Sequence, residues 1–387
     1  MDAQPTFLAL SGETQTGPNI FWTKTALRYA QTTGDLLWLE EYLPTLRNAS
    51  SFCFDLIDRS LHLLNAPGSL MVDVFIRANF TADSNAMMVG FLLDFAEVED
   101  IVGSKTRAEE LRTQASLMKD AMNQRLWDRA DNDHYITQLN PDNSTRDFVD
   151  YDANLIAIAH AIPSIEQSTA ILKRIDSGAC SCASGGGPQW VSERYYGPKD
   201  TTGGNIGDSR CAMGRIAWFD AHARKRLNTE DSLTAFNRAL DVLQNDLVTN
   251  TWMHERYGCD GKMQQNRTNF YFEYPSMVVM LMREIRYGIN LSYQTVEIKP
   301  FGVHEYVYNI GDVYVSYSAS AVELNVPGTG TREYQLSGLI PDQKYRVMLE
   351  DGTKIGMFTS VNEGDLSFTA PVGQLLLVNV TGSVYMS

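Results

Sequence analysis

Basic residues and long apolar segments are both in short supply in this sequence. The 387 residues include 32 Lys and Arg against 47 Asp and Glu, which gives a net charge of −15. Nucleic-acid binding depends largely on basic side chains that neutralise phosphates, and anionic membrane surfaces attract the same side chains. No apolar run approaches the roughly 18 residues of a transmembrane helix. The composition therefore predicts neither a nucleic-acid partner nor a membrane partner.

Cysteine is also scarce, and the motifs of several enzyme classes are missing. The five cysteines leave at least one unpaired, and no His or Cys pair follows Cys180 and Cys182 at the spacing of a zinc site. No Gly-X-Ser-X-Gly motif occurs, and His254-Glu255 lacks the second His of a zinc peptidase. No group of carboxylates has calcium-loop spacing. We therefore expect no metal and no cofactor.

The sequence gives two opposed indications of compartment. The segment 1–15 lacks both the basic region and the continuous apolar region of a signal peptide. Asn-X-Ser/Thr sites, which accept glycans in secreted proteins, point the other way. They begin at Asn48, Asn79, Asn143, Asn266, Asn290 and Asn379. A secreted protein is favoured weakly by these sites, and a cytoplasmic one if the N-terminus is native.

The first three quarters of the chain have the pattern of helices. Between Ala108 and Leu126, apolar residues recur every three or four positions and form one stripe. Similar helical segments are predicted at 20–31, 35–57, 84–101, 152–161, 165–175, 209–226, 231–249 and 275–287. Longer loops separate pairs of helices, at 58–83, 127–151, 177–208 and 250–274. Loops of this length within a compact domain usually carry function.

From about residue 293 the pattern changes to that of strands. The runs 313–317, 345–349 and 375–380 are rich in β-branched, aromatic or leucine residues. Turn signals such as Pro327-Gly328 and Asp351-Gly352 separate them. The sequence therefore predicts a small antiparallel β-sandwich after the helices.

Four stretches together resemble the six-hairpin (α/α)6-barrel glycoside hydrolases, in particular debranching amylo-α-1,6-glucosidases, trehalases and α-L-rhamnosidases. They are Phe21-Trp22 to Tyr42-Leu43-Pro44 with its Thr33-Gly34-Asp35 turn, Ser69 to Asp73, Ser84-Asn85-Ala86, and Trp252 to Asp260-Gly261. The resemblance implies an (α/α)6 toroid over residues 1–290, followed by the β-sandwich over 291–387. About nine helices are predicted where a complete barrel has twelve, so the first hairpin is expected to be absent or the chain to be shortened.

Glycoside hydrolysis needs one carboxyl group to protonate the leaving oxygen and another to activate water or attack the sugar. By resemblance, Asp73 is the candidate general acid and Glu255 the candidate general base. Asp83 is a rival acid that could instead cap the next helix, and Glu273 is a rival base. Asp73 could equally be a helix cap, and Glu255 could pair with a neighbouring cation. The family's Trp is missing from the acid motif, where Met71 lies in or near its place.

Sugar binding needs flat apolar faces and planar polar groups. Trp190 and Tyr196 are candidate stacking platforms, although ordinary packing would explain them as well. The polar candidates, each also open to an ion-pairing or helix-capping explanation, are Arg77, Asp150, Glu193, Arg194, Asp208 and Glu273.

The resulting hypothesis is a glycosidase that cleaves a glycosidic bond of an oligo- or polysaccharide or a glycoconjugate, with a carbohydrate substrate and an inverting mechanism. Two alternatives stay open. One is a polysaccharide lyase or glycoside phosphorylase on the same fold, with Arg194, Tyr195 and Tyr196 as candidates for a lyase. The other is a non-catalytic carbohydrate-binding protein.

Overall fold

A computed structural model describes residues 14–72, 74–177, 189–202, 212–258, 262, 271, 273–361 and 363–380. The side chains of residues 212, 213 and 273 are outside this description. Contacts divide the chain into a helical unit, Met1–Leu27 with Glu40–Val278, and a second unit, Arg28–Leu39 with Val279–Ser387. The domain boundary predicted between residues 290 and 291 stays a prediction.

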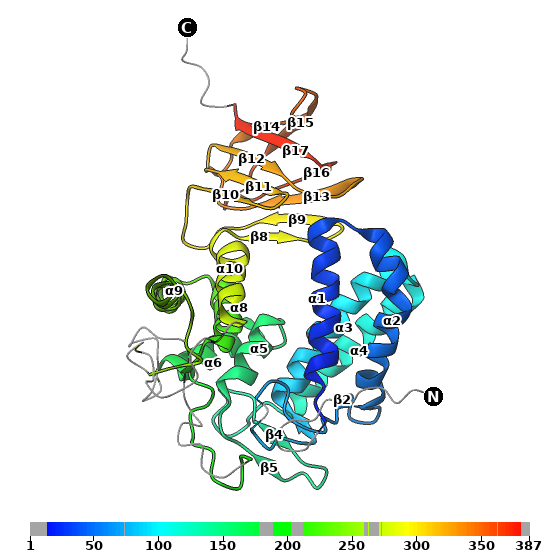
Figure 1. The fold of residues 1–387 in the computed structure, drawn as a ribbon, viewed down its shortest axis with the longest axis vertical. Helices are drawn as coiled ribbons and strands as arrows, with labels where there is room; N and C mark the ends of the chain where they lie inside the picture. Colours follow the sequence, from blue (N-terminus) through cyan, green and yellow to red (C-terminus); the bar gives the residue numbers. More distant parts are fainter. Residues whose placement is uncertain are drawn as a thin grey trace. The chain divides into compact units, whose positions relative to one another are not determined.

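The predicted fold class, helices followed by a β-rich region, is confirmed (Figure 1). Each predicted helical segment overlaps one helix of the described residues. These helices are α1 (Gly17–Thr33), α2 (Leu36–Asp55), α3 (Ala82–Val102), α4 (Lys105–Arg125), α5 (Tyr151–Ala159), α6 (Ile165–Ser177), α8 (Ala217–Leu227), α9 (Glu230–Asn250) and α10 (Glu273–Met280), which continues as the π-helix η2 (Leu281–Arg286).

Burial separates the inner helices from the outer ones. Helix α3 buries most of its length, and α5 buries eight of its nine residues, because both are apolar on almost every side. Helices α4, α6 and α9 each bury one stripe and expose the rest. Helix α3 packs against α4 and α5, and α8 packs against α5 and α9. The inner surface of this unit is therefore formed largely by α3, α5 and α8.

One close approach shows how tightly the inner helices pack. A Cβ atom added to Gly90 in α3 would lie 2.3 Å from two atoms of the His160 imidazole, at the end of α5. Only a residue without a side chain leaves room for this ring. Burial and the nearby Lys24 hold the pKa of His160 well below its ordinary value, so the ring that packs on Gly90 is neutral.

Short strands tie the long segments before the inner helices to one another. Strands β3 (Phe80–Thr81), β4 (Gln138–Leu139) and β5 (Thr145–Arg146) form one small sheet, and β1 (Ile57–Asp58) pairs with β2 (Leu63–Leu64). Strand β6 (Ala212–Met213) pairs with β7 (Arg256–Tyr257), which sets Met213 opposite Arg256. The loops that carry the candidate residues are thus joined by backbone hydrogen bonds.

The second unit contains a two-sheet sandwich. One sheet has the order β10-β11-β12-β17-β14-β15, and the other has the order β16-β13-β9-β8. All pairings are antiparallel except that of β13 with β9, which is parallel. The strands are β8 (Ile289–Leu291), β9 (Thr295–Ile298), β10 (Tyr306–Ile310), β11 (Val313–Tyr317), β12 (Ala321–Asn325), β13 (Thr331–Leu336), β14 (Lys344–Leu349), β15 (Lys354–Thr359), β16 (Leu366–Pro371) and β17 (Gln374–Asn379).

Alternation along these strands builds the core of the sandwich. In β11, Val313, Val315 and Tyr317 are buried while the residues between them are partly exposed. The same period of two is expected for a sheet with one face against the core. Gly311 and Gly352 turn β10 into β11 and β14 into β15 with positive φ angles of 62° and 84°, which glycine adopts without strain.

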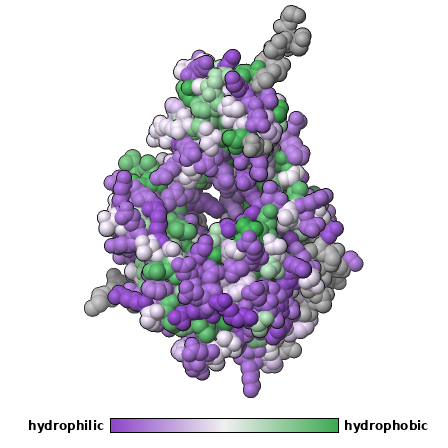
Figure 2. Space-filling model, turned by 180° about the vertical axis from the view of Figure 1, so that it is seen from behind, coloured by the Kyte–Doolittle hydropathy of each residue, from purple (hydrophilic) through white to green (hydrophobic). Residues whose placement is uncertain are grey.

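The described surface is largely polar. On the face shown in Figure 2, apolar side chains lie in small separate groups among hydrophilic ones. Within the part of the chain that the structure describes, no helix is long and apolar enough to cross a membrane.

Candidate active site

A buried charged cluster lies where the long loops meet the inner helices. The Arg77 side chain is 1% exposed, and its Nη1 atom lies 2.7 Å from Asp83 and 3.3 Å from Asp152. Its Nη2 atom lies 3.1 Å from Asp150 and donates a hydrogen bond of 2.9 Å to the Tyr196 hydroxyl. Asp83 lies in the first turn of α3, and Asp150 immediately precedes α5. One arginine thus joins the beginnings of two inner helices.

This cluster contains more carboxyl groups than basic groups, and this imbalance affects the protonation of its aspartates. Burial raises the pKa of Asp150 to about 7, and the neighbouring Asp152 adds to this effect while Arg77 opposes it. Burial also raises the pKa of Asp152. Burial of Asp150 and Asp152 beside each other therefore favours a proton shared within this pair over full ionisation of both. The Tyr196 hydroxyl donates a short hydrogen bond to Asp150, so the hydroxyl stays protonated.

The Tyr196 ring is packed on both faces. It stacks on Phe75 and on Phe148, with ring centroids 4.1 Å apart in each case. The side chain is therefore held rigidly, and its hydroxyl is the part that reaches the charged cluster. Trp190, the other candidate platform, is partly exposed at the start of the same loop.

A second group of contacts surrounds Glu255. The Nη2 atom of Arg215 lies 3.9 Å from one carboxylate oxygen of Glu255, and the Nε atom of Arg256 lies 3.5 Å from the other. Arg215 also donates through Nη1 to the carbonyl of Met71, at 3.2 Å, and through Nη2 to the Tyr271 hydroxyl. Arg215 therefore contacts both the loop of Asp73 and the loop of Glu255.

The Glu255 side chain is 14% exposed, so it is mostly covered. The Tyr274 hydroxyl donates a hydrogen bond of 3.0 Å to the Glu255 carbonyl. The Tyr274 ring occupies the space that a side chain on residue 214, a glycine, would need. A glycine at position 214 thus allows the ring to fix the backbone at Glu255. Helix α10 and the segment before α8 both position this residue.

The loop after Asp73 is fastened by a neighbouring segment. Ile76 and Thr202 form backbone hydrogen bonds of 2.8 Å with Asp200 and Val74 respectively. Arg146 pairs with Asp200 and donates to the Ile76 carbonyl at 3.2 Å. The backbone that follows the candidate acid is consequently held from two sides.

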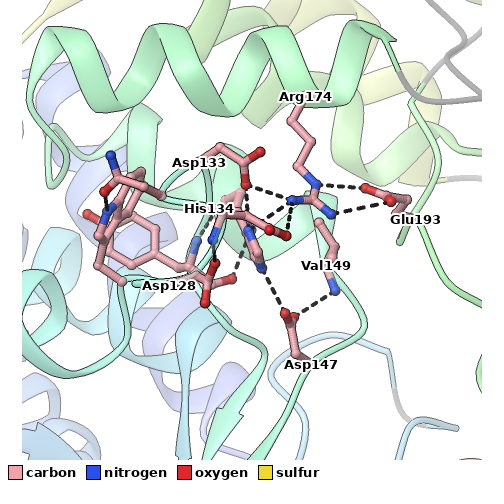
Figure 3. A network of polar contacts seen from close by, with 12 residues as sticks. Asp128, Asp133, His134, Asp147, Val149, Arg174 and Glu193 are labelled. Atoms are coloured by element: carbon pink, nitrogen blue, oxygen red, sulfur yellow. Dashed lines mark hydrogen bonds and ion pairs between the residues drawn. The ribbon is translucent and has the colours of Figure 1, made fainter.

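A network of charged residues lies beside these loops (Figure 3). His134 is buried, with Nδ1 2.8 Å from Asp133 and Nε2 2.8 Å from Asp147. Arg174, on α6, contacts Glu193 at 2.8 Å and Asp133 at 2.7 Å. Burial opposes charge on His134, but the hydrogen bonds to Asp147 and Asp133 outweigh it and raise the pKa of the imidazole.

One group within the described residues has the composition of a metal site. Asp128, Asp131 and His134 each offer a ligand atom, and these atoms lie within 4.8 Å of one another. Both ring nitrogens of His134 already form hydrogen bonds with carboxylates, and Asp128 accepts from the Asp131 backbone N–H at 2.6 Å. Protein groups therefore satisfy this imidazole, and we do not assign a metal to it.

The structure brings only some of the predicted site residues together. Arg77, Asp150 and Tyr196 come together in one cluster, whereas Glu255 lies in the other. Glu193 pairs with Arg174, and Arg194 is exposed. Asp73 and Asp208 lie outside the described residues, and Glu273 begins α10 with its side chain likewise outside them.

Sequence reasoning missed several residues that the structure brings to these clusters. Asp83, the rival acid with a helix cap as its alternative, lies inside α3, which begins at Ala82 after Thr81, and its pairing with Arg77 is not indicated by the sequence. Arg215 precedes α8 without any motif that marks it. His134 and Asp147 are thirteen residues apart in a loop, and no spacing rule indicates that they form a pair.

Comparison with known families adds evidence of a different kind. Residues 16–183 match the model of the trehalase family. The predicted resemblance to the six-hairpin glycosidases is confirmed. This match includes the loops of Arg77 and Asp150, and it supports a glycosidase.

Solved structures show a similar fold. A GH78 family rhamnosidase of Bacillus SP. GL1 is 15% identical, with a TM-score of 0.53 over 81% of this chain and 31% of the rhamnosidase. An α-L-rhamnosidase from Dictyoglumus thermophilum is 12% identical, with a TM-score of 0.54 over 93% of this chain and 39% of its own. A structure described as a sialidase is 14% identical, with a TM-score of 0.58 over 94% and 33%.

At these identities the likeness concerns the fold alone. The chain spans between 31% and 39% of the length of these three structures. No curated protein matches the sequence closely enough to count as a relative. Substrate and catalytic residues must therefore be argued from this chain's own site.

Proposed function

We propose that this protein is a glycoside hydrolase that acts on an oligo- or polysaccharide or a glycoconjugate and inverts the anomeric centre. In this proposal Asp73 is the general acid and Glu255 the general base. The acid protonates the glycosidic oxygen as the bond breaks, and the base removes a proton from the attacking water. Inversion requires room for that water between two carboxyl groups roughly 6.5–9.5 Å apart.

The observation that carries the proposal is the double contact of Arg215. Its guanidinium donates to the carbonyl of Met71, two residues before Asp73, and lies 3.9 Å from Glu255. One rigid fork of donors therefore spans the two loops on which the family resemblance puts the acid and the base. Two distant carboxylates on separate loops need such a link to keep a fixed separation.

The surroundings of Glu255 suit a base. Arg215 and Arg256 lie near opposite oxygens of the carboxylate, at 3.9 Å and 3.5 Å, and hold it between two guanidinium groups. The side chain keeps 14% of its surface exposed, so a water molecule can reach it. Arg77, Asp150 and Tyr196 are too enclosed to bind a sugar directly, and we assign them the task of holding the loop of Asp73.

Kinetics on a panel of aryl glycosides, with Asp73→Asn and Glu255→Gln as variants, tests the proposal. We expect activity on at least one glycoside and a loss of at least about 1,000-fold in kcat for each variant, since both groups act in the transition state. Asp83→Asn tests the rival general acid, and its kcat is compared with that of Asp73→Asn. Retained activity in Asp73→Asn or Glu255→Gln would refute the assigned role.

Product stereochemistry tests the inverting part separately. Proton NMR of the first product formed shows whether its anomeric configuration is opposite to that of the substrate. The same reaction run with added inorganic phosphate distinguishes hydrolysis from phosphorolysis, because only a phosphorylase forms a sugar phosphate. Retention of configuration would contradict inversion while leaving the glycosidase assignment intact.

A further inference from the structure

Val149 has a backbone conformation that valine rarely adopts. Its φ angle is 51°, in the left-handed region, and nine described residues other than glycine have a positive φ. Most of the nine are Asn, Asp, His or Ala, whereas Val149 and Thr251 are β-branched. A branched side chain is disfavoured there because its Cβ approaches the carbonyl oxygen. Such strain persists only where the surrounding contacts impose it.

The contacts that impose it can be identified. The Val149 N–H donates to Oδ1 of Asp147 at 2.9 Å, and the Val149 carbonyl accepts from the Glu193 N–H at 3.1 Å. Both polar groups of the Val149 backbone are thus occupied. Asp147 is two residues earlier in the same loop, so its position depends on what holds its other oxygen.

That other oxygen is bonded to His134. Oδ2 of Asp147 lies 2.8 Å from Nε2 of His134, as Figure 3 shows, and Asp133 lies 2.8 Å from the opposite ring nitrogen. Arg174 from α6 faces the imidazole at 3.4 Å, and Asp128 interacts with it electrostatically. A buried imidazole between two carboxylates is a fixed anchor, because movement would break a charge-assisted bond on each side.

The strained residue leads directly into the buried cluster. Asp150 follows Val149 and lies 3.1 Å from Arg77, which is on the loop of Asp73. A change of φ at Val149 would rotate the chain at Asp150 and move its carboxylate away from Arg77 and Tyr196. Contacts therefore run without a gap from His134 through Asp147, Val149 and Asp150 to Arg77, on the loop of the candidate acid.

We propose that His134 is a positioning residue: through Asp147 it holds Val149 in the left-handed conformation, and thereby sets Asp150 against Arg77 and fixes the loop of the candidate general acid. This rests on the proposed function for its catalytic consequence, but not for its structural part. The raised pKa of His134 supports it, because the protonated imidazole binds both carboxylates most strongly.

The first test measures melting temperature, which needs no activity. In His134→Gln the Asp147 anchor is lost, and we expect Tm to fall by about 4 °C or more at pH 6. The folded pKa of His134 lies above its unfolded value, so its contribution is complete below about pH 6.5 and declines as the pH rises through the folded pKa. The difference in Tm between the parent protein and His134→Gln should therefore narrow as the pH rises from 6 to 9.

The second test asks whether the effect passes through Val149. Glycine adopts a positive φ without strain, but Val149→Gly also removes a side chain that is 1% exposed, a loss common to both backgrounds. The change in Tm on Val149→Gly should therefore be more favourable in His134→Gln than in the parent protein, by at least half of the Tm lost in His134→Gln. Asn228→Gly is the matched control, because Asn228 also has a positive φ, of 50°, but ends α8 away from the network. The proposal would be overturned if Val149→Gly changed Tm equally in the parent protein and in His134→Gln.

Activity on a cleaved glycoside then reports the catalytic part. We expect kcat of His134→Gln to fall by about tenfold with KM less changed, and Val149→Gly to recover most of it. An absence of any glycosidase activity would refute the proposed function, yet the Tm cycle would still decide the role of His134. If His134→Gln does not fold, the solubilities of two double variants are compared instead. The proposal is supported if His134→Gln/Val149→Gly is soluble while His134→Gln/Asn228→Gly is insoluble. It is contradicted if both double variants are insoluble.

Discussion

The Nη2 atom of Arg215 lies 3.9 Å from Oε1 of Glu255. At this distance the two groups attract each other without forming a direct hydrogen bond, and the Tyr271 hydroxyl accepts from Nη2 instead. The Arg215 side chain is 19% exposed, and its Nη1 atom donates to the Met71 carbonyl at 3.2 Å. Arg215 therefore bonds to the Met71 carbonyl and the Tyr271 hydroxyl while it lies beside Glu255.

Replacing Arg215 should reduce catalysis far more than stability. Arg215→Met removes both links between the loops, and we expect kcat/KM on a cleaved aryl glycoside to fall about 100-fold, because small displacements of reacting groups are costly. Arg215→Lys keeps the charge but not the fork and should lose about tenfold. Steady-state kinetics with Tm as the folding check measures both.

The control for Arg215 is Arg112→Met on α4, where Arg112 forms an exposed ion pair with Asp100. Surface ion pairs of this kind contribute little to stability, so kcat/KM of Arg112→Met should stay within about twofold of that of the parent protein. An Arg215→Met protein with the activity of Arg112→Met would show that the two loops keep their positions without Arg215.

Removing the Tyr196 hydroxyl should destabilise the helical unit. In Tyr196→Phe, Arg77 loses an acceptor and Asp150 a donor inside a closed cluster, while the stacking on Phe75 and Phe148 is kept. Leaving buried polar groups unpaired costs about 1–3 kcal/mol, or a fall in Tm of about 5 °C. Differential scanning calorimetry measures it. Tyr195→Phe, at a side chain that is 59% exposed, is the comparison and should change Tm by less than about 1 °C.

Asp150 should make stability depend on pH in a defined window. Its pKa rises to about 7 on folding, so the folded protein holds a proton that the unfolded chain releases near pH 4. The contribution of this group to stability therefore falls as the pH rises from about 4 to about 7. Asp150→Asn cannot titrate, so its Tm should improve relative to the parent across that window and then level off. A constant difference in Tm between pH 4 and pH 8 would contradict the shift.

Gly90 and His160 should show strong coupling. Gly90→Ala puts a methyl group 2.3 Å from the His160 ring, and overpacking of this kind costs about 1–3 kcal/mol. His160→Ala removes the obstacle, so the double variant should be more stable than the sum of the two single effects by at least about 1 kcal/mol. Urea unfolding of the four proteins gives the coupling energy, and additivity would mean that the ring moves aside freely.

Much of the fold follows from local patterns in the sequence. The stripe from Ala108 to Leu126 predicts an amphipathic helix because one face must be buried, and α4 occupies Lys105–Arg125. The strand predicted at 313–317 coincides with β11. Helix starts were less accurate: within the predicted segment 209–226, the described residues form β6 at Ala212–Met213, a 3-10 turn at Gly214–Ile216, and α8 only from Ala217.

The candidate site was predictable only where a motif marked it. Arg77, Asp150 and Glu255 lie in loops that the family resemblance or their composition singled out. Their partners could not be found in the same way, because contacts such as Arg77 with Asp152, 75 residues apart, depend on the packing of α3 against α5. The left-handed Val149 is the opposite of what its β-branched side chain predicts, and only tertiary contacts explain it.

The small strands β6 and β7 have a consequence for how this site can change. Met213 is paired with Arg256, so the segment carrying Arg215 and the segment carrying Glu255 share a fixed register. A single insertion between Met213 and Arg215 would shift the guanidinium away from the Met71 carbonyl and the Tyr271 hydroxyl. The pairing of β6 with β7 therefore constrains the length of the segment between Met213 and Arg215 more strictly than its composition.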